Sequence, residues 1–430
     1  MLENDTPRAL EEALRALDRE FAALPDFQAP AARGIDSVMT EVAARLGDNF
    51  PYFHPLYAGQ MLKPPHPVAR AAYALATWIN PNNHALDGGR ASSGMERDAV
   101  AQIAAMFGWQ EHLGHLAGGG TMANMEALWV ASLLRPGKKI VASSQSHYTH
   151  ERISGVLQLP FAKAPADTRG RLDPKALECM LKAGDIGCVV ATLGTTATGS
   201  VDPLPEILAL RDRYGFRVHV DAAYGGYFTL ADNLGPEARA AFDRVADADS
   251  IVIDPHKHGL QPYGCGCVLF RDPEVGTLYK HDSPATYFSS RQQHLGEISL
   301  ECSRPGAAAV ALWATMRLLP LARGGEFARN LAASRRAALA LHARLATDAR
   351  FLTPIEPQLD IVVWTPRTGS AQRIFDEAAK RNLHLALARL PGAWFGQKDE
   401  VLALRSVLMK PEHEQWIGRI WEILDQVTNA

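Results

Sequence analysis

The stretch from Ile253 to Gly259, "IDPHKHG", places a lysine between two histidines directly after an apolar run, "SIVI". A lysine amine at a strand end could attack a carbonyl compound, because amines of this kind serve as nucleophiles in enzymes. A cationic cluster where a strand meets a loop is also an ordinary surface turn. Other strand ends in the sequence bear on the choice between these two interpretations.

Two of these strand ends carry groups that complement such a lysine. In "HVDAAYGG" (219–226), Asp221 ends an apolar run and is followed by two alanines, which are small enough to let a flat ring lie against them. A buried carboxylate is costly unless a cation pairs with it. In "LAGGGTMANMEALWV" (116–130), a glycine-rich turn opens a helix whose free N–H groups could hold a phosphate, although this pattern alone also forms plain tight turns.

A lysine, a buried aspartate and a phosphate cradle are the three features that pyridoxal 5′-phosphate (PLP) needs. The cofactor requires an amine for its Schiff base, a carboxylate that keeps its pyridine nitrogen protonated, and an anion site. The three features together are far more specific than any one of them. The sequence therefore predicts PLP as the cofactor.

The chain also resembles the group II PLP-dependent amino-acid decarboxylases, a family that includes glutamate, aromatic-L-amino-acid and tyrosine decarboxylases. Its members have the aspartate aminotransferase fold, which is PLP fold type I. The resemblance spans roughly residues 50 to 410 and runs through these stretches in order: "HP" (54–55), "MER" (95–97), "ATLGTT" (191–196), "HVDAAYGG", "DPHK" (254–257) and "LRSVL" (404–408). It implies decarboxylation of an L-amino acid to an amine and CO2.

The resemblance implies a role for each matching residue. Lys257 would form the Schiff base, and Asp221 would face the pyridine nitrogen. Ala223 would pack under the ring, His147 would stack on its other face, and Thr196 would lie near the substrate-facing edge. The full set of implied cofactor-binding residues is Gly119, Gly120, Thr121, His147, Thr196, Asp221, Ala223, His256 and Lys257.

Within this set, His256 matches a position near the phosphate and the Schiff base, and the glycine turn would supply phosphate donors. The sequence departs from the family pattern at two positions. Met122 stands where many relatives have glutamate, and Asp254 stands where several have asparagine. Asp254 would put a carboxylate near the proposed phosphate, so we assign it no binding role.

The family usually returns a proton to Cα from a tyrosine on a loop that reaches across the dimer interface. The corresponding region here, 281–306, offers Tyr287 and His294, and different relatives favour different choices. A histidine in place of the tyrosine would alter protonation and make an oxidative side reaction conceivable.

Substrate selection is predicted from two regions. Gln60, in "LYAGQML", lies at a position that resembles the glutamate and cysteine-sulfinate branch, and Arg405 matches an arginine that can face a substrate carboxylate. The stretch "NPNNHALDGGR" (80–90) contributes Asn83, His84 and Arg90 as polar candidates, which are equally well explained as capping or surface residues. We expect a polar or acidic amino acid as the substrate, with tyrosine or another aromatic amino acid as the alternative.

Other reactions use the same cofactor, because the Cα bond that stands perpendicular to the ring is the one that breaks. The motifs alone therefore also fit a decarboxylating oxidase, a carbon–carbon lyase or an aminotransferase. A catalytically silent binding protein is disfavoured, since Lys257 and Asp221 are both present.

The elements that must position these residues are strands alternating with helices between about 100 and 270. This alternation predicts a mostly parallel sheet whose ligands gather at the carboxyl ends of the strands. A long helix from about 307 to 345 is expected to lead into a smaller α+β part. The predicted strands are "KKIVASS", "GCVVATLGTT", "FRVHVDAAY", "SIVID" and "CGCVLFRD" in the large part, and "DIVVWTP", "LHLALARL" and "VLALRSVL" in the small part, which a helix from about 411 closes.

We therefore expect an α/β protein of PLP fold type I with a mostly parallel seven-stranded sheet. Its predicted parts are an N-terminal helical segment (1–60), a large PLP-binding domain (61–320) and a small C-terminal domain (321–430). The first segment should form a helix with a leucine-rich stripe and no obvious intrachain partner, which predicts a homodimer with cofactor sites near the interface.

Composition excludes several other classes of function. The 44 basic and 47 acidic side chains nearly cancel, so no strong field attracts nucleic acid or an anionic membrane. No segment is apolar enough to span a bilayer, and the N-terminus lacks the pattern of a secretory signal. Five cysteines without a ligand-like spacing predict no structural metal and a reduced, cytoplasmic protein.

Overall fold

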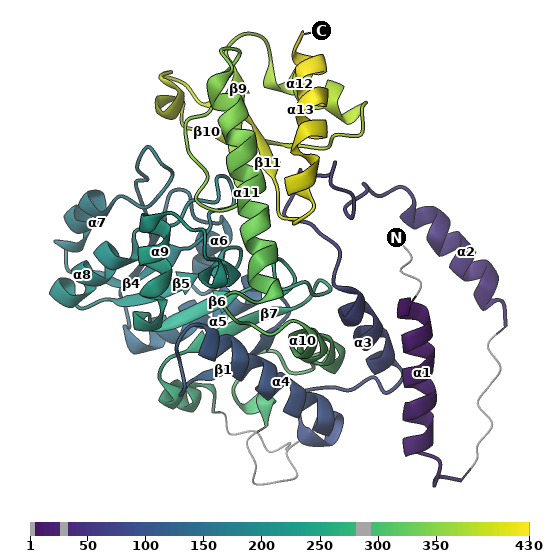
Figure 1. The fold of residues 1–430 in the computed structure, drawn as a ribbon. Coiled ribbons are helices and arrows are strands. Elements are labelled where there is room, and N and C mark those ends of the chain that lie inside the picture. The colour runs from purple at the N-terminus through teal and green to yellow at the C-terminus, as the bar shows by residue number, and fades with distance from the viewer. Residues whose placement is uncertain (1–4, 26–32, 281–293, 430) are drawn as a thin grey trace.

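The computed structural model describes residues 5–25, 33–280 and 294–429 (Figure 1). The described residues form a central seven-stranded sheet with the order β1-β7-β6-β5-β4-β2-β3. β7 runs antiparallel to both neighbours, and the other pairs are parallel, which confirms the predicted mostly parallel sheet. The strands are β1 (Leu113–Ala117), β2 (Lys139–Ser143), β3 (Phe161–Ala164), β4 (Ile186–Thr192), β5 (Arg217–Asp221), β6 (Ser250–Ile253) and β7 (Gly266–Phe270).

Helices pack against this sheet, and its central strands are buried along their whole length. The helix that follows the glycine turn, α5, lies across β1 and β4 to β7. Buried apolar strands of this kind are typical of a parallel sheet covered on both faces. The helices of the large part are α3 (Pro67–Thr77), α4 (Leu86–Met106), α5 (Gly120–Leu134), α6 (Thr149–Val156), α7 (Pro174–Leu181), α8 (Leu204–Tyr214), α9 (Pro236–Asp243) and α10 (Gly306–Leu318).

The C-terminal part is built on a smaller sheet in which all strand pairs are antiparallel, with the order β10-β11-β9-β8. The long helix α11 contacts both this sheet and the 3-10 helix at 226–230 of the large part, so it joins the two (Figure 1). The elements are α11 (Glu326–Thr347), β8 (Phe351–Leu352), β9 (Ile361–Pro366), α12 (Ala371–Ala379), β10 (Ala386–Leu390), β11 (Val401–Val407) and α13 (His413–Asn429).

The structure differs from the sequence expectation in two respects. The strands β1, β3 and β8 were not predicted, because they are short and carry little of the β-branched pattern that marks the others. The predicted long helix from about 307 to 345 is two helices, α10 and α11, because Pro320, Gly324 and Gly325 interrupt it. The division of the chain at residues 60 and 320 stays a prediction.

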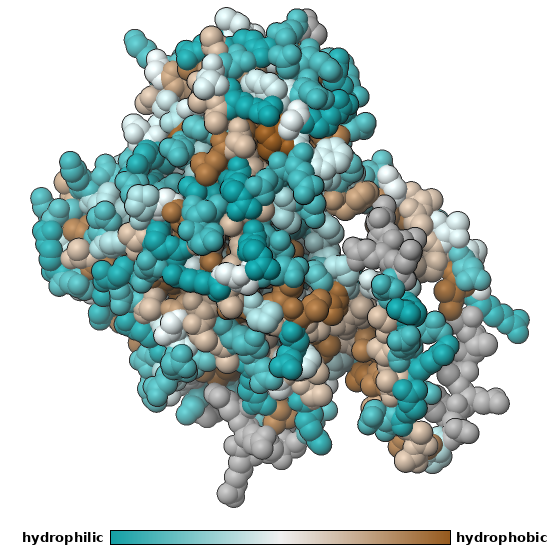
Figure 2. Space-filling model, viewed as in Figure 1, coloured by the Kyte–Doolittle hydropathy of each residue, from teal (hydrophilic) through white to brown (hydrophobic). Residues whose placement is uncertain are grey.

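An N-terminal arm, α1 (Asp5–Glu20) and α2 (Ile35–Leu46), lies beside the body of the molecule (Figures 1 and 2). The expectation that the first helix lacks a partner in its own chain was wrong, because α1 packs on α3. Every residue of α2, in contrast, is exposed. In the described ranges, no helix is long and apolar enough to cross a bilayer.

A buried ion pair ties the start of the large part together. Arg304 Nη1 donates to Glu96 Oε1 at 2.6 Å and to the Leu116 carbonyl at the end of β1 at 2.7 Å, and both charged side chains are almost fully buried. Asn83 donates from Nδ2 to the other oxygen of Glu96 at 2.6 Å. The network holds α4, β1 and the loop before α10 in one arrangement.

Replacing Arg304 with methionine should lower the free energy of unfolding by about 3–5 kcal/mol, because Glu96 then stays buried without its cation. Urea denaturation of the two proteins measures the difference. Arg419→Met is the control, since the pair that Arg419 forms with Glu422 is exposed and should contribute little. Equal unfolding midpoints for Arg304→Met and the unchanged protein would contradict the structural role of this pair.

Candidate active site

A cavity of about 320 Å³ lies at the carboxyl ends of the parallel strands, within the size range of small-molecule sites. Its walls come from the segments that follow β1, β2, β4, β5 and β6. The structure brings all of the predicted cofactor residues into this cavity: Gly119, Gly120, Thr121, His147, Thr196, Asp221, Ala223, His256 and Lys257.

Asp221, the last residue of β5, is held by hydrogen bonds on both carboxylate oxygens. His150 Nε2 lies 2.8 Å from Oδ2, and the backbone N–H of Ala223 donates to Oδ1 at 3.1 Å. Burial alone would raise the pKa of Asp221, but the hydrogen bond from His150 and the charges of His150 and Lys257 outweigh it and hold that pKa below its usual range. Asp221 therefore faces the cavity as a carboxylate.

Lys257 follows β6 in a tight turn and forms an ion pair with Asp254, whose Oδ2 lies 3.0 Å from the lysine Nζ. His256 Nε2 lies 3.5 Å from the same oxygen. Burial lowers the pKa of His256, and the charge of Asp254 offsets this only in part. Asp254, to which the sequence assigned no role, is thus the counter-ion of the lysine amine.

The glycine turn after β1 places the start of α5 at the cavity. Gly119 has a φ of +147°, which is accessible to glycine and not to other residues, and the α5 helix begins at Gly120. A Cβ on Gly120 would lie 2.8 Å from Asp254 Oδ2. The open backbone N–H groups of the first turn can therefore hold an anion beside the lysine.

His147 and Ala223 line the cavity together with Thr196. His147 Nδ1 lies 2.8 Å from Thr149 Oγ1, and burial lowers the pKa of His147, so this ring is neutral near pH 7. The cavity thus contains an amine, a carboxylate, a helix N-terminus, and two side chains, His147 and Ala223, between which a flat ring could lie. This combination fits the chemistry of PLP. Three buried atoms of this lining, Thr192 Oγ1, Asp254 Oδ1 and His256 Nδ1, have no hydrogen-bond partner among the described residues, and those of Thr192 and His256 are open to a ligand.

The predicted wall at 80–90 does not line this cavity. Asn83 is fully buried in the network with Glu96, and His84 packs against Gly296 and lies 3.6 Å from the Cys302 sulfur. The cavity of this chain therefore gives no support to the assignment of Asn83 and His84 to substrate binding, which stays a prediction. Arg90 is exposed.

Of the two predicted proton donors, only His294 belongs to the described residues. Tyr287 lies outside the described residues. His294 is buried, and its Nδ1 accepts a hydrogen bond from the backbone N–H of Leu86 at 3.0 Å. Its backbone N–H donates to Glu297 Oε2, which caps a short 3-10 helix. His294 therefore does not face Lys257 of its own chain, and the geometry gives no support to its catalytic role.

Gln60 and Arg405, the other two predicted substrate-binding residues, contact each other outside the lining of this cavity, and their role in substrate binding stays a prediction. Arg405 Nη1 donates to Gln60 Oε1 at 3.3 Å and lies 3.4 Å from the Gly59 carbonyl. Arg405 is 4% exposed, and its Nε and Nη2 have no hydrogen-bond partner among the described residues. Its charge also acts on the buried phenol of Tyr224, which lines the cavity.

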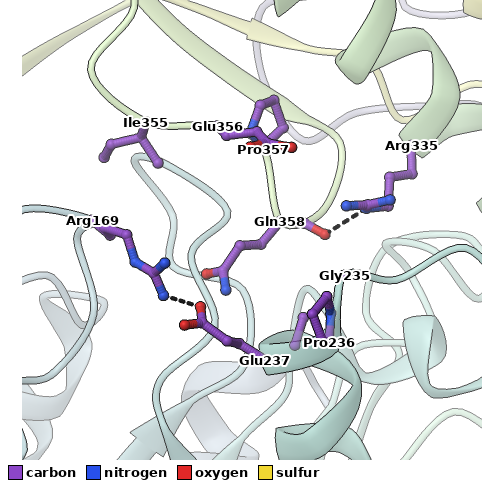
Figure 3. Close-up of a pocket in the computed structure, with 10 residues that line it drawn as sticks. Arg169, Gly235, Pro236, Glu237, Arg335, Ile355, Glu356, Pro357 and Gln358 are labelled. Atoms are coloured by element: carbon purple, nitrogen blue, oxygen red, sulfur yellow. Dashed lines mark hydrogen bonds and ion pairs between the residues drawn. The ribbon is translucent and has the colours of Figure 1, made fainter.

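A second cavity, of about 420 Å³, lies away from this chemistry, between the loop 355–358 and the segment 235–238 (Figure 3). Its arginines already have acceptors: Arg169 pairs with the Glu237 side chain, and Arg335 Nε donates to the backbone carbonyl of Gln358 at 2.8 Å. Among its lining residues there is no lysine or histidine. We regard it as a polar gap at the interface between the two parts of the molecule.

Sequence reasoning missed two functional side chains. His150 could have been found, because it lies three residues after His147 and so faces the same side of a helical turn. Asn124 lines the cavity and accepts a hydrogen bond from His219, but its position in α5 carries no signal in the sequence. Burial lowers the pKa of His219 to about 3, so this histidine is neutral.

Comparison with known proteins agrees with this geometry. The pyridoxal-dependent decarboxylase conserved domain matches residues 49–366. A probable L-tyrosine/L-aspartate decarboxylase of Methanopyrus kandleri is 26% identical over 86% of this chain and 95% of its own. A probable L-aspartate decarboxylase of Halobacterium salinarum is 32% identical over 60% of this chain and 70% of its own.

Among solved structures, the Oryza sativa TDC with PLP and tryptamine has the same fold, with a TM-score of 0.80, 20% identity, and coverage of 100% of this chain and 98% of that one. The fold therefore agrees with the match to the conserved domain. That domain match extends over most of the chain and includes every residue from Gly119 to Lys257 that faces the cavity. The chain belongs to the pyridoxal-dependent decarboxylase family and is a PLP-dependent amino-acid decarboxylase.

Proposed function

We propose that this decarboxylase acts on a polar or acidic L-amino acid, with aspartate or glutamate as the first choice, and releases CO2 and the corresponding amine. The observation that carries the proposal is Arg405, a buried guanidinium with two donors that no described residue accepts. The names of the relatives support it, since one is called an L-tyrosine/L-aspartate and another an L-aspartate decarboxylase.

Arg405 would attract a carboxylate electrostatically. No described carboxylate lies within ion-pair distance of its guanidinium, and the one side-chain acceptor that it has is the neutral amide of Gln60. A buried charge without a counter-ion costs free energy, which an incoming carboxylate recovers through charge-assisted hydrogen bonds. An acidic side chain on the substrate is the carboxylate that Arg405 would select.

Tyrosine is the second candidate, and a specific cluster favours it. Beside Gln60, the rings of Tyr52 and Tyr57 meet edge to face at 4.9 Å, and Phe50 lies 6.3 Å from Tyr57. The Tyr57 hydroxyl accepts the backbone N–H of Gln60 at 3.3 Å. An aromatic substrate would find edge-to-face partners here. A relative from Enterococcus faecium is named an L-tyrosine decarboxylase.

The geometry of the cavity supports the following roles for the residues that would hold PLP. The amine of Lys257 would carry it covalently, Asp221 would hold the proton on its pyridine nitrogen, and the first turn of α5 would bind its phosphate. His147 and Ala223 would flank its ring. When bound, the cofactor supplies a sink for the electrons released when the bond to CO2 breaks.

The chain's own groups then control the reaction. His150 orients Asp221 and keeps it ionised. Asp254 keeps a counter-charge beside the Lys257 amine. After CO2 leaves, Cα needs a proton, and the neutral ring of His147 is a poor acid near pH 7. Tyr287 stays the proposed donor, with Lys257 Nζ as the described group that could replace it.

We further propose a homodimer held by α2. Its exposed apolar side chains follow a helical stripe: Ile35, Val38, Met39, Val42 and Leu46. Exposed stripes of this length are rare on monomeric proteins, and no other element of the described chain packs on α2. A second copy of the chain is the occupant that we propose, because α2 is joined to the segment that leads to Gln60.

The cytoplasm is the proposed compartment, since all five cysteines are free.

Arg405→Met should lower kcat/KM for L-aspartate and L-glutamate by roughly 30- to 150-fold, because a charged hydrogen bond to the substrate contributes about 2–3 kcal/mol. The value for L-tyrosine should fall less than 10-fold. CO2 release from a panel of amino acids measures both, with Lys257→Ala as the inactive control. Arg389→Met, at an exposed position of the same sheet, should change neither. Equal losses for acidic and aromatic substrates would show that Arg405 does not select the side chain.

Asp221→Asn should keep the shape of the site and remove the charge at the pyridine nitrogen. We expect the cofactor-saturated variant to lose at least about 100-fold in decarboxylation rate, which is a barrier increase of about 2.7 kcal/mol. It should also retain cofactor less tightly, because one charge-assisted hydrogen bond is gone. A near-normal rate in the saturated variant would refute the assigned role of Asp221.

Val38→Glu should convert the proposed dimer into a monomer, because it puts a charge in the middle of the apolar stripe. Light scattering after gel filtration gives the mass of each form at micromolar concentration. The control is Leu133→Glu, at an exposed position near the end of α5, which should leave the mass unchanged. A monomeric mass for the unchanged protein would contradict the proposal.

A further inference from the structure

A third cavity, of about 440 Å³, lies between the segment that leads into α3 and the turn before α13. It is separate from the cavity of Lys257, although Leu260, three residues after that lysine, forms part of its wall. Pro64, Pro65 and Pro67 form another part, and prolines restrict the backbone there. The cavity is therefore a fixed feature of the fold.

Two lysines face this cavity with most of their hydrogen-bonding capacity unused. Lys63 Nζ donates to the Met409 carbonyl at 3.3 Å. Lys410 is 3% exposed, and its Nζ donates to the Tyr57 carbonyl at 2.7 Å and lies over the Tyr57 ring. Each ammonium group has three donors. Neither lysine has a carboxylate within 4 Å among the described residues.

The two lysines have little opposite charge beside them. Apart from Lys63 and Lys410, the wall contains one carboxylate, that of Glu412, together with His66 and Arg70, which interact elsewhere in the fold. Burial lowers the pKa of Lys410 to about 7, and the neighbouring charge of Lys63 adds to this effect. Burial also lowers the pKa of Lys63 to about 8, and the charges of Asp360 and Glu412 offset this only in part. The two ammonium groups are thus desolvated and repel each other.

An anion between the two lysines would reverse both effects. Phosphate-type oxyanions suit this arrangement, because their several oxygen acceptors match the unused lysine donors. A cavity of this size also leaves room for a short organic group on the anion. We propose that this cavity binds a small dianion of the sulfate or phosphate type, held by Lys63 and Lys410, at a site distinct from that of the cofactor.

Binding at this site should take up protons. Both lysines hold a proton more tightly beside a dianion, and sulfate itself does not titrate between pH 7 and 9. Sulfate should therefore bind more weakly at pH 9 than at pH 7. The other titratable or charged groups that act on the two lysines or on their neighbours are Tyr57, His66, Arg70, His258, Asp360, Glu412 and His413.

The pH dependence of stability without the anion follows from the same shifts. A lysine whose pKa is lowered in the folded protein gives up its proton on folding, so its charge destabilises the folded state below that pKa. This destabilisation of the folded state decreases as the pH rises from the folded-state pKa, about 7 for Lys410 and about 8 for Lys63, toward the ordinary pKa of lysine. Bound sulfate should flatten this dependence.

The test uses the holoenzyme saturated with PLP, so that the cofactor's own phosphate site is filled. Sulfate at constant ionic strength, with chloride as the balancing salt, should raise the thermal midpoint in a saturable way. Titration calorimetry at pH 8, in two buffers of different protonation enthalpy, should show the uptake of about one proton. A rise no greater than that in chloride, or binding without proton uptake, would overturn the proposal.

Variants assign the effect to the two lysines. Lys63→Met and Lys410→Met should each abolish the sulfate response, and Lys398→Met, at an exposed position, should keep it. Lys63→Arg keeps the charge but cannot lose a proton, so it should bind sulfate with less proton uptake. This variant also serves if a methionine variant fails to fold. An unchanged response in both methionine variants would place the sulfate elsewhere.

Binding of glycerol phosphate distinguishes a phosphate ester from a free inorganic dianion as the ligand of this cavity. Tighter binding than sulfate, lost in the same variants, assigns the remaining space of the cavity to the organic group of a phosphate ester. Sulfate binding without glycerol phosphate binding assigns the site to a free inorganic dianion. Both results support a dianion site, whereas a response to glycerol phosphate that persists in Lys410→Met contradicts it.

Discussion

The hydrogen bond between His150 and Asp221 is the interaction on which the active site depends. It joins the first turn of α6 to the end of β5, in the middle of the sheet, where His150 is fully buried and Asp221 is almost fully buried. A carboxylate at this depth stays ionised only because a donor on each oxygen replaces the lost hydration. With that charge fixed, a cation is favoured beside it in the cavity, and a protonated pyridine is such a cation.

The rest of the site balances charge around this centre. Asp254 pairs with Lys257, and the positive end of α5 lies beside Asp254 and offsets part of its charge. Burial keeps His147 and His256 neutral, so that they shape the cavity without adding charge. A parallel sheet makes this balance available, because the carboxyl ends of β1, β2, β4, β5 and β6 lie at one edge.

The small part of the molecule contributes charge as well as shape. Asp360, just before β9, accepts the Tyr224 hydroxyl at 2.6 Å and lies 3.2 Å from His258 Nε2, next to Lys257. Arg405 comes from the neighbouring strand β11 and reaches Gln60. If the proposed role of Arg405 holds, the substrate-facing side of the site is assembled from both sheets.

The sequence alone determined the cofactor side of the site. Asp221 ends one predicted apolar strand and Lys257 follows another, and strand ends of a parallel sheet must converge. The glycine turn at 118–120 was recognised from its own pattern, because the strand before it, β1, was not predicted. Local pattern also gave the mostly parallel sheet and most of its strands. Only the tertiary structure decided which polar residues are free to act. Asn83, His84 and His294 match the pattern of site residues, but packing uses their side chains elsewhere. The hydrogen bond between His150 and Asp221 depends on contacts between distant segments, which no local pattern encodes. The same holds for the proximity of Lys63 to Lys410, which are 347 positions apart in the sequence.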